Sequence, residues 1–195
     1  MKVTLLHYSP IWLIEHGARV CTNTEDTMDS CEMTRKMEEF ITKLVKSGHH
    51  SVLEHVVYTF YIEGVSRALL QELARHRIGM SLSVQSTRWA LKRILSGDAE
   101  PVLPEKLTPQ DREVWMKKID ELMCLASDCR ERYGNDVAKY ILPECTPTTL
   151  QLTCNARSLK HLFELRSNPP ALREFNELCM AMDAALPEDH KFMFS

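Results

Sequence analysis

The feature that most constrains this chain is the stretch Ser66–Trp89, SRALLQELARHRIGMSLSVQSTRW. It predicts an amphipathic helix whose apolar side chains pack inward, because they recur at helical spacing. These side chains are Leu69, Leu70, Leu73 and Ala74. The helix is expected to end in Arg75-His76-Arg77 and to lead into an extended segment with Ser83, Gln85, Ser86, Thr87 and Arg88. Guanidinium groups and hydroxyls suit a phosphorylated, planar ligand better than a hydrophobic core.

The three residues at the helix end cannot all face one point, because successive helical residues turn by about 100°. Either the helix unwinds at Gly79, or the side chains line different subsites that belong to different subunits; a mixture of both is favoured. The alternative is a solvated basic end that complements the helix dipole. The continuation Ser86-Thr87-Arg88 favours a binding role.

Hydrophobic patterns along the chain predict an α+β fold, with a small, mainly antiparallel sheet flanked by helices. The clearest strand is 56–65, in which Tyr58, Phe60 and Ile62 share one face. The clearest helix begins at TPQD, residues 108–111, and continues to Tyr133 before Gly134. Further strands are expected at 1–8 and 148–153, and further helices at 11–19, 33–46, 136–141, 156–166 and 171–186.

Length and composition are those of an ordinary globular chain. With 195 residues, 44% of them hydrophobic and 26% charged, the chain is expected to form a single domain over 1–195. A net charge of −3 argues against general nucleic-acid binding, and no run approaches the ~18 apolar residues of a membrane helix. The seven cysteines form no CxxC motif and no signal-peptide pattern opens the chain, so reduced thiols and a cytoplasmic location are expected.

A histidine cluster in the sequence GHHSVLEH raises the question of a metal site. His50 and His55 are five residues apart and His49 and His55 are six apart, so neither pair shares a helix face as zinc-binding helices require. No metal is therefore expected. The local pattern instead predicts a helix start, with Ser51 as the cap and Glu54 as its capping-box partner.

Three blocks, in this order along the chain, resemble the signature of the flavin-dependent thymidylate synthases. The central match is SRALLQELARHR followed by SVQSTRW, since that family shows Arg-His-Arg, then typically seven residues, then Ser-x-Arg. GHHSVLEH at Gly48–His55 is similar to the family's Gly-His-x-Ser-x-x-Glu-His, and NARSLKHLFELR at Asn155–Arg166 also agrees. The resemblance covers most of the chain and is least diagnostic over Leu95–Ala138.

The resemblance implies a flavin site and a nucleotide site. The positions that match flavin-binding residues are Ser51, Arg75, His76, Arg77, Asn155, Arg157 and His161. The positions that match deoxyuridylate-binding residues are Glu72, Gln85, Ser86, Arg88, Lys139 and Arg166. Ser86 and Arg88 correspond to phosphate contacts, and Arg166 to the arginine at the pyrimidine, where a cation stabilises negative charge that develops on the ring. His49, Ser86 and Arg166 are the positions expected to take part in catalysis.

Several positions depart from the family pattern. Eight residues, Ile78–Gln85, separate Arg77 from Ser86, and a bulge or loop at Gly79-Met80 could absorb the additional one. Single departures are Glu72 for Gln, Val84 for the Glu of some members, Trp89 for Tyr, Lys139 for Arg and His161 for Asn. Glu72 is expected to face the sugar or base, because a carboxylate beside a phosphate is unfavourable. Lys139 is equally compatible with a solvated helix lysine.

The implied reaction is reductive methylation of dUMP to dTMP, with methylenetetrahydrofolate as the carbon donor and NADPH-reduced FAD as the hydride source. The absence of a GxGxxG fingerprint is consistent with a flavin site that is not of the Rossmann type. The cofactor carries the difficult chemistry, so no cysteine nucleophile is needed, and Ser86, with no base beside it in the sequence, is expected to bind rather than attack. A homotetramer with shared active sites is also implied. The alternatives are a catalytically impaired nucleotide-binding homologue with a regulatory role and a zinc-dependent hydrolase that uses the histidine cluster.

Overall fold

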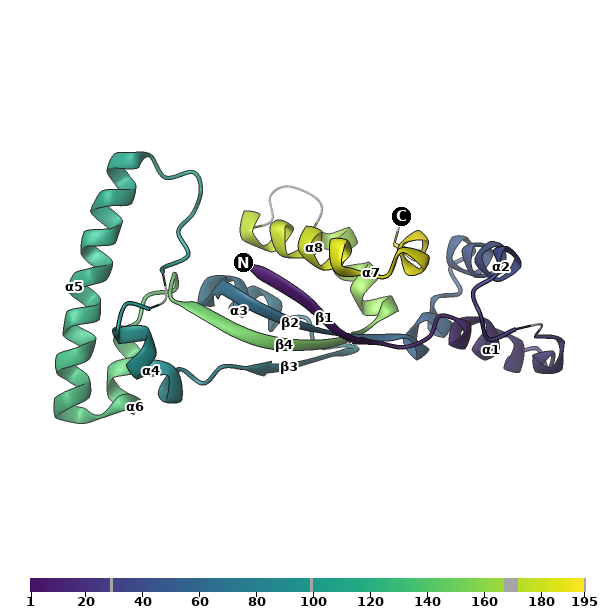
Figure 1. Cartoon of the computed structure of the whole chain (residues 1–195), viewed down its shortest axis with the longest axis horizontal. Helices are drawn as coiled ribbons and strands as arrows, with labels where there is room; N and C mark the ends of the chain where they lie inside the picture. Colours follow the sequence, from purple (N-terminus) through teal and green to yellow (C-terminus); the bar gives the residue numbers. More distant parts are fainter. Residues whose placement is uncertain (29, 99, 167–171, 195) are drawn as a thin grey trace. The chain divides into compact units, whose positions relative to one another are not determined.

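The structure, a computed structural model, describes residues 1–28, 30–98, 100–166 and 172–194. A four-stranded sheet has the strand order β1-β2-β4-β3 (Figure 1). The strands are β1 (Lys2–Tyr8), β2 (Val57–Ser66), β3 (Met80–Val84) and β4 (Pro147–Asn155). β3 and β4 run in opposite directions, because the N–H of Gln85 donates to the carbonyl of Thr149 and the N–H of Asn155 donates to that of Gly79. The predicted α+β fold with an antiparallel sheet is confirmed.

The chain divides into two compact units. The first, called the α5 unit, comprises Met1, Glu63–Arg75 and Ser83–Leu150. The second, called the α7 unit, comprises Lys2–Ile62, His76–Leu82 and Gln151–Ser195. Strands β2, β3 and β4 each contribute residues to both units.

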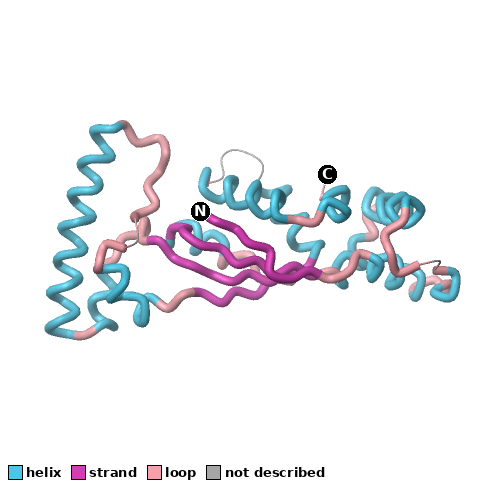
Figure 2. Tube along the Cα trace, viewed as in Figure 1, coloured by secondary structure: helices cyan, strands magenta, loops and turns pink. Residues whose placement is uncertain are grey.

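The α5 unit is mainly helical (Figure 2). It contains α3 (Arg67–Leu73), α4 (Thr87–Leu95), α5 (Pro109–Tyr133), α6 (Asn135–Ala138) and the 3₁₀ helix η3 (Lys139–Ile141). Helix α5 begins as predicted, because Thr108 Oγ1 accepts a 3.1 Å hydrogen bond from the N–H of Asp111. It ends before Gly134, whose φ of +83° lies in a region that glycine adopts more easily than other residues. Along α5, Ile119 and Ala126 are buried, whereas Trp115 is 43% exposed.

Helix α3 is shorter than the sequence predicts. Ser66 caps it as expected, with its hydroxyl accepting a 3.0 Å hydrogen bond from the N–H of Leu69. The helix ends at Leu73, so Ala74 is exposed and does not pack inward. The triplet 75–77 follows the helix instead of ending it. The side-chain directions of residues 75–77 are therefore not set by helix geometry and give no support to a site shared between subunits.

The extended segment predicted up to Trp89 is also wrong. Strand β3 ends at Val84, and α4 begins at Thr87 with Ser86 as its N-cap residue. Burial of Leu91 and Ile94, three residues apart, explains the helix, because that spacing places both side chains on one helix face. The residues expected to bind phosphate consequently lie at a helix N-terminus.

The α7 unit contains β1 and the remaining helices of the described residues. These are α1 (Trp12–Val20), α2 (Arg35–Lys46), α7 (Ala156–Arg166), α8 (Arg173–Ala185) and the 3₁₀ helices η1 (Glu25–Thr27), η2 (His50–His55) and η4 (Glu188–Met193). Helix α7 has the predicted bounds, whereas the predicted start of α8 at Ala171 and the dipeptide Pro169-Pro170 lie outside the described residues. Tyr58, Phe60 and Ile62 are fully buried on one face of β2, as predicted. Among the residues described, none of the helices has the length and apolar character needed to cross a bilayer.

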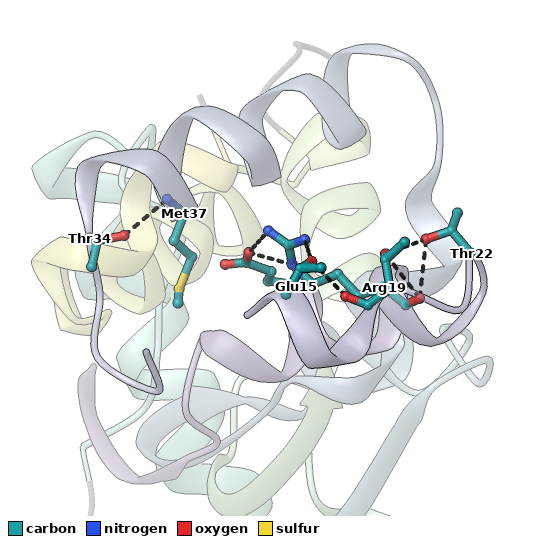
Figure 3. A network of polar contacts seen from close by, with 7 residues as sticks. Glu15, Arg19, Thr22, Thr34 and Met37 are labelled. Atoms are coloured by element: carbon teal, nitrogen blue, oxygen red, sulfur yellow. Dashed lines mark hydrogen bonds and ion pairs between the residues drawn. The ribbon is translucent and has the colours of Figure 1, made fainter. Parts of the chain in front are cut away.

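A partly buried ion pair between Arg19 and Glu15 connects the first helices of the α7 unit (Figure 3). Glu15, which is 6% exposed, accepts a 2.7 Å hydrogen bond from Arg19 Nε one helical turn further along α1. The same guanidinium donates to Thr27 Oγ1 at 2.5 Å and lies 5.2 Å from the ring centre of Phe40 on α2. Arg19 thus connects α1 with both η1 and α2, because one planar cation contacts a carboxylate, a hydroxyl and an aromatic face.

A second buried polar pair joins the 3₁₀ helix η4 to the sheet. The hydroxyl of Tyr58 lies 2.7 Å from Nδ1 of His190, and both residues are at most 1% exposed. Burial, with a smaller contribution from Cys154 and Asp189, raises the pKa of Tyr58, so the phenol keeps its proton and donates to the imidazole. Burial also lowers the pKa of His190, which keeps that ring neutral.

Candidate functional site

Two residues expected to contact the nucleotide, Ser86 and Arg88, lie at the N-terminus of α4 in the α5 unit. Ser86 is the N-cap residue, and its side chain makes no capping hydrogen bond. Thr87 and Arg88 are the first two residues of the helix, and the side chains of Ser86 and Arg88 are exposed. The first N–H groups of a helix and the positive end of its dipole favour an anion. This geometry suits a phosphate group although it differs from the predicted extended backbone.

Two cations from different elements converge on one carboxylate. Arg88 Nε lies 3.4 Å from Asp136 Oδ2, and Lys139 Nζ lies 3.5 Å from Asp136 Oδ1. The side-chain amide of Asn135 donates to the carbonyl of Arg88 at 2.9 Å and thereby joins α6 to α4. Solvent-exposed pairs of this kind contribute little to stability. A phosphate oxygen can therefore replace the carboxylate of Asp136 at small cost.

A cavity of about 210 Å³ in the same unit is lined by Arg67, Thr87, Lys139 and Tyr140. Arg67 Nη1 donates to Thr87 Oγ1 at 2.7 Å, and Lys139 Nζ lies 5.9 Å from the ring centre of Tyr140. Neither Arg67 nor Tyr140 is a site residue predicted from the sequence. The signal for Arg67 is a cation at the first position of a helix, where the dipole disfavours it. Tyr140 is recognisable only by its position next to Lys139.

The other predicted residues of the α5 unit, Glu72, Arg75 and Gln85, contact neighbours on the helix or on the next strand. Glu72 and Arg75 form an exposed ion pair, with Oε1 and Nη1 3.6 Å apart. The backbone N–H of Gln85 donates to Thr149 at 2.8 Å and extends the pairing of β3 with β4. The carboxylate of Glu72 therefore has a neighbouring cation, and its expected position on the sugar or base side stays a prediction.

In the α7 unit, Asn155 fixes the turn that follows the basic triplet. Its Oδ1 accepts a 2.8 Å hydrogen bond from the N–H of Ser158 and so caps helix α7. Ser158 Oγ in turn donates to the carbonyl of Ile78 at 2.8 Å. Gly79 has a φ of +65°, and a Cβ there would overlap Ser158 Oγ and Asn155 Nδ2. Only glycine fits this turn, which lies where the additional residue between Arg77 and Ser86 is expected.

His76 and Arg166, predicted for different ligands, contact each other in the α7 unit. Arg166 Nη2 lies 3.0 Å from His76 Nε2. Because a guanidinium can only donate, Nε2 accepts and the ring proton of a neutral His76 is on Nδ1. The guanidinium carbon lies 4.4 Å from the ring centre of Phe175, and His76 meets the same ring edge-on at 5.8 Å. Arg166 is therefore held in one orientation by an aromatic face and a histidine.

The GHHSVLEH block and helix α7 meet through an ion pair of 2.6 Å between Glu54 Oε1 and Arg157 Nη1. The predicted capping box is wrong, because η2 is a 3₁₀ helix whose N-cap residue is His49 and whose first turn has no side-chain cap. Glu54 pairs with Arg157 and not with the helix start. The other predicted residues of this unit, His49, Ser51, Arg77 and His161, are all exposed.

Neither the cysteines nor the histidine cluster adds a reactive centre to the described residues. All seven cysteines are free thiols. Burial raises the pKa of Cys154 to about 12, so this thiol stays protonated near neutral pH. Within the described ranges, no three His, Cys, Asp or Glu side chains come together in a way that could hold a metal ion. His50 instead donates from Nε2 to the carbonyl of Val45 at 3.0 Å.

Comparison with solved structures identifies the class of fold. The chain matches the crystal structure of thymidylate synthase X (ThyX) from Helicobacter pylori with FAD and dUMP with a TM-score of 0.87 and 33% sequence identity. The match covers 100% of this chain and 98% of that one. The UMP/dUMP methylase PolB from Streptomyces cacaoi, bound with 5-Br dUMP, has the same fold, with a TM-score of 0.76 at 23% identity over 94% of this chain and 88% of that one.

Comparison of sequences identifies the family. The family described as thymidylate synthase complementing protein matches residues 4–189. The flavin-dependent thymidylate synthase of Campylobacter jejuni strain RM1221 is 40% identical over 100% of this chain and 96% of its own length. That of Wolinella succinogenes is 38% identical over 100% of this chain and 97% of its own length. The chain belongs to the thymidylate synthase complementing protein family.

Proposed function

We propose that this chain is a flavin-dependent thymidylate synthase, an enzyme of the methyltransferase type that converts dUMP to dTMP by reductive methylation. Methylenetetrahydrofolate is the carbon donor and NADPH the reductant. The observation that carries the proposal is the full-length similarity to the Helicobacter pylori structure with FAD and dUMP. The catalytically impaired, regulatory alternative has no observation in its favour.

The nucleotide is assigned to residues of the α5 unit and to Arg166. Ser86 and Arg88 bind the phosphate at the start of α4, and Lys139 supplies a second cation that already pairs with Asp136. Glu72 and Gln85 are assigned to the sugar and base side. Among the described residues, none is hydrogen-bonded to the hydroxyl of Ser86, which supports its role as a binder and not as an activated nucleophile.

Arg166 is assigned to the pyrimidine, where its fixed orientation has a chemical consequence. The contacts with His76 and Phe175 hold the guanidinium in place before any ligand binds. A cation that is already oriented stabilises negative charge on the uracil ring without reorganisation during the reaction. His49, exposed at the start of η2, is assigned to the same reaction centre.

The chemistry of the remaining predicted residues fits FAD. Guanidinium groups with exposed donors suit its pyrophosphate, and the amide, hydroxyl and imidazole groups suit its polar ring edge. The residues proposed to hold it are Ser51, Arg75, His76, Arg77, Asn155, Arg157 and His161. When bound and reduced by NADPH, FAD would supply the hydride that completes the methyl group.

We extend the proposal to the assembly and its location. Residues 1–195 act as one domain, four chains form a homotetramer with shared active sites, and the enzyme works in the cytoplasm without nucleic-acid or membrane partners. The resemblance to the family supports the tetramer, and seven free thiols suit a reducing compartment.

The visible spectrum of the purified protein tests the proposal. We expect flavin absorption that NADPH bleaches, together with dUMP binding that does not require a metal. Protein that stays colourless after incubation with excess FAD, or activity that depends on zinc and is lost with a chelator, would refute it.

A further inference from the structure

Arg67 occupies a position that folding alone does not favour. It is the first residue of α3, and its backbone N–H donates to the carbonyl of Thr146 at 3.1 Å, which fixes its place beside β4. Positive charge is unfavourable at a helix N-terminus, because the dipole already places partial positive charge there. Ser66 already supplies the cap, and an acidic residue would suit the first turn better than an arginine.

The guanidinium of Arg67 also has no acidic partner among the described residues. Its Nη1 donates at 2.7 Å to the neutral hydroxyl of Thr87. Across the described part of the chain, no carboxylate forms an ion pair with Arg67, although Arg88 and Lys139 both pair with Asp136. The residue is half-buried, so part of its hydration is lost without a compensating charge. The missing counter-charge points to an anionic ligand.

The cavity defines the size and chemistry of that ligand. Its lining consists of Arg67, Thr87, Lys139 and Tyr140, which are two cations and two hydroxyl-bearing side chains. Its volume of about 210 Å³ is below the roughly 300–1,000 Å³ of sites that enclose a whole drug-sized ligand. A phosphate monoester fits these properties, because it is small, carries up to two negative charges and accepts several hydrogen bonds.

We propose that Arg67 is a further binding residue for the 5′-phosphate of the nucleotide and that it positions Thr87 at the start of α4 for the same group. This inference rests on the proposed function. Nη1 is engaged by Thr87, and the other N–H groups of the guanidinium remain for phosphate oxygens. With Arg67 the phosphate is bound by three cations from separate segments, the others being Arg88 and Lys139.

The test compares ligands with and without the phosphate. Calorimetry on the purified protein gives the dissociation constants of dUMP, deoxyuridine and inorganic phosphate for the wild type, Arg67→Gln and Arg67→Lys. Loss of one charge-assisted hydrogen bond predicts dUMP binding that is roughly ten- to hundredfold weaker in Arg67→Gln. Deoxyuridine binding should not change, and Arg67→Lys should restore part of the affinity for dUMP. Arg93→Gln, an exposed arginine of the same helix α4, is the matched control and should bind dUMP as the wild type does.

Two results would overturn the inference. Unchanged dUMP affinity in Arg67→Gln would remove Arg67 from the phosphate site. An equal loss for dUMP and deoxyuridine would indicate a structural role only. If the proposed function is wrong, the wild type should bind neither dUMP nor FAD. The inorganic phosphate measurement would then still decide whether Arg67 binds an anion.

Discussion

Substitution of Gly79 by alanine tests whether the turn after the basic triplet supports the site. Gly79 has a φ of +65°, and an added Cβ would overlap Ser158 Oγ and Asn155 Nδ2 and lie 2.9 Å from Asn155 Cγ. Neither side chain can move away without losing a hydrogen bond. Ser158 Oγ donates to Ile78, and Asn155 Oδ1 accepts from the N–H of Ser158.

The expected loss of stability follows from three contributions. The left-handed backbone costs a non-glycine residue about 1–2 kcal/mol. Loss of the Asn155 cap costs about 1 kcal/mol, and loss of the Ser158 hydrogen bond costs about 1 kcal/mol. Gly79→Ala should therefore lower the free energy of unfolding by about 3–4 kcal/mol.

Gly97→Ala is the control that separates the cost of a left-handed backbone from the cost of steric overlap. Gly97 has a φ of +80°, and no atom of the described residues lies within 4 Å of an added Cβ. The control should lose the strain contribution only, and the gain from a less flexible unfolded chain is shared by both variants. Urea denaturation should give a difference of about 2 kcal/mol between them, and FAD affinity should fall only in Gly79→Ala. Equal losses of stability with equal FAD affinity would refute the argument that this turn supports the flavin site.

Three further outcomes are expected. Arg88→Ala should weaken dUMP binding by about 1.5–3 kcal/mol, the value of a charged hydrogen bond. Asp136→Asn should not weaken it, because the carboxylate of Asp136 competes with phosphate for the same cations. Calorimetry measures dUMP affinity in both variants, and equal losses would contradict the exchange of Asp136 for phosphate. Ser86→Ala should retain measurable dTMP formation in a turnover assay, and complete loss with intact dUMP binding would restore the nucleophile hypothesis. The free energy of unfolding should decrease as the pH falls below about 6.5, because burial lowers the pKa of His190 and the unfolded chain therefore binds a proton more readily than the folded one. His190→Gln should reduce this pH dependence in denaturation curves recorded from pH 8 to 5. An unchanged slope would exclude His190 as its source.

Local signals in the sequence predict much of the fold. Helix α5 follows from a threonine cap, a proline at the first position and a glycine at the end, all of which act within one turn of the helix. Large apolar residues at alternate positions predict β2, and the structure buries these residues on one face. The start of α4 was predicted incorrectly, because the hydroxyl-rich residues before it suit an extended chain. The deciding residues, Leu91 and Ile94, lie one to two turns later.

The site geometry depends on contacts that local patterns do not determine. Arg88 meets Asp136 across 47 intervening residues, and Ser158 binds the carbonyl of Ile78 from a different block. Family resemblance can name both ends of such a contact but not the contact itself. In the sequence, Arg67 is marked only by its charge at the first position of a helix. The cavity, and the lack of a carboxylate partner among the described residues, are what assign it to a site.

The most direct test of the proposed function is the stoichiometry of product formation under anaerobic conditions. The purified chain is loaded with FAD and given NADPH, methylenetetrahydrofolate and dUMP. We predict one dTMP formed for each NADPH oxidised, and no dTMP when FAD, the folate or dUMP is omitted. NADPH oxidation that continues without dTMP, in protein that binds both FAD and dUMP, would contradict the assignment of this chain as a thymidylate synthase.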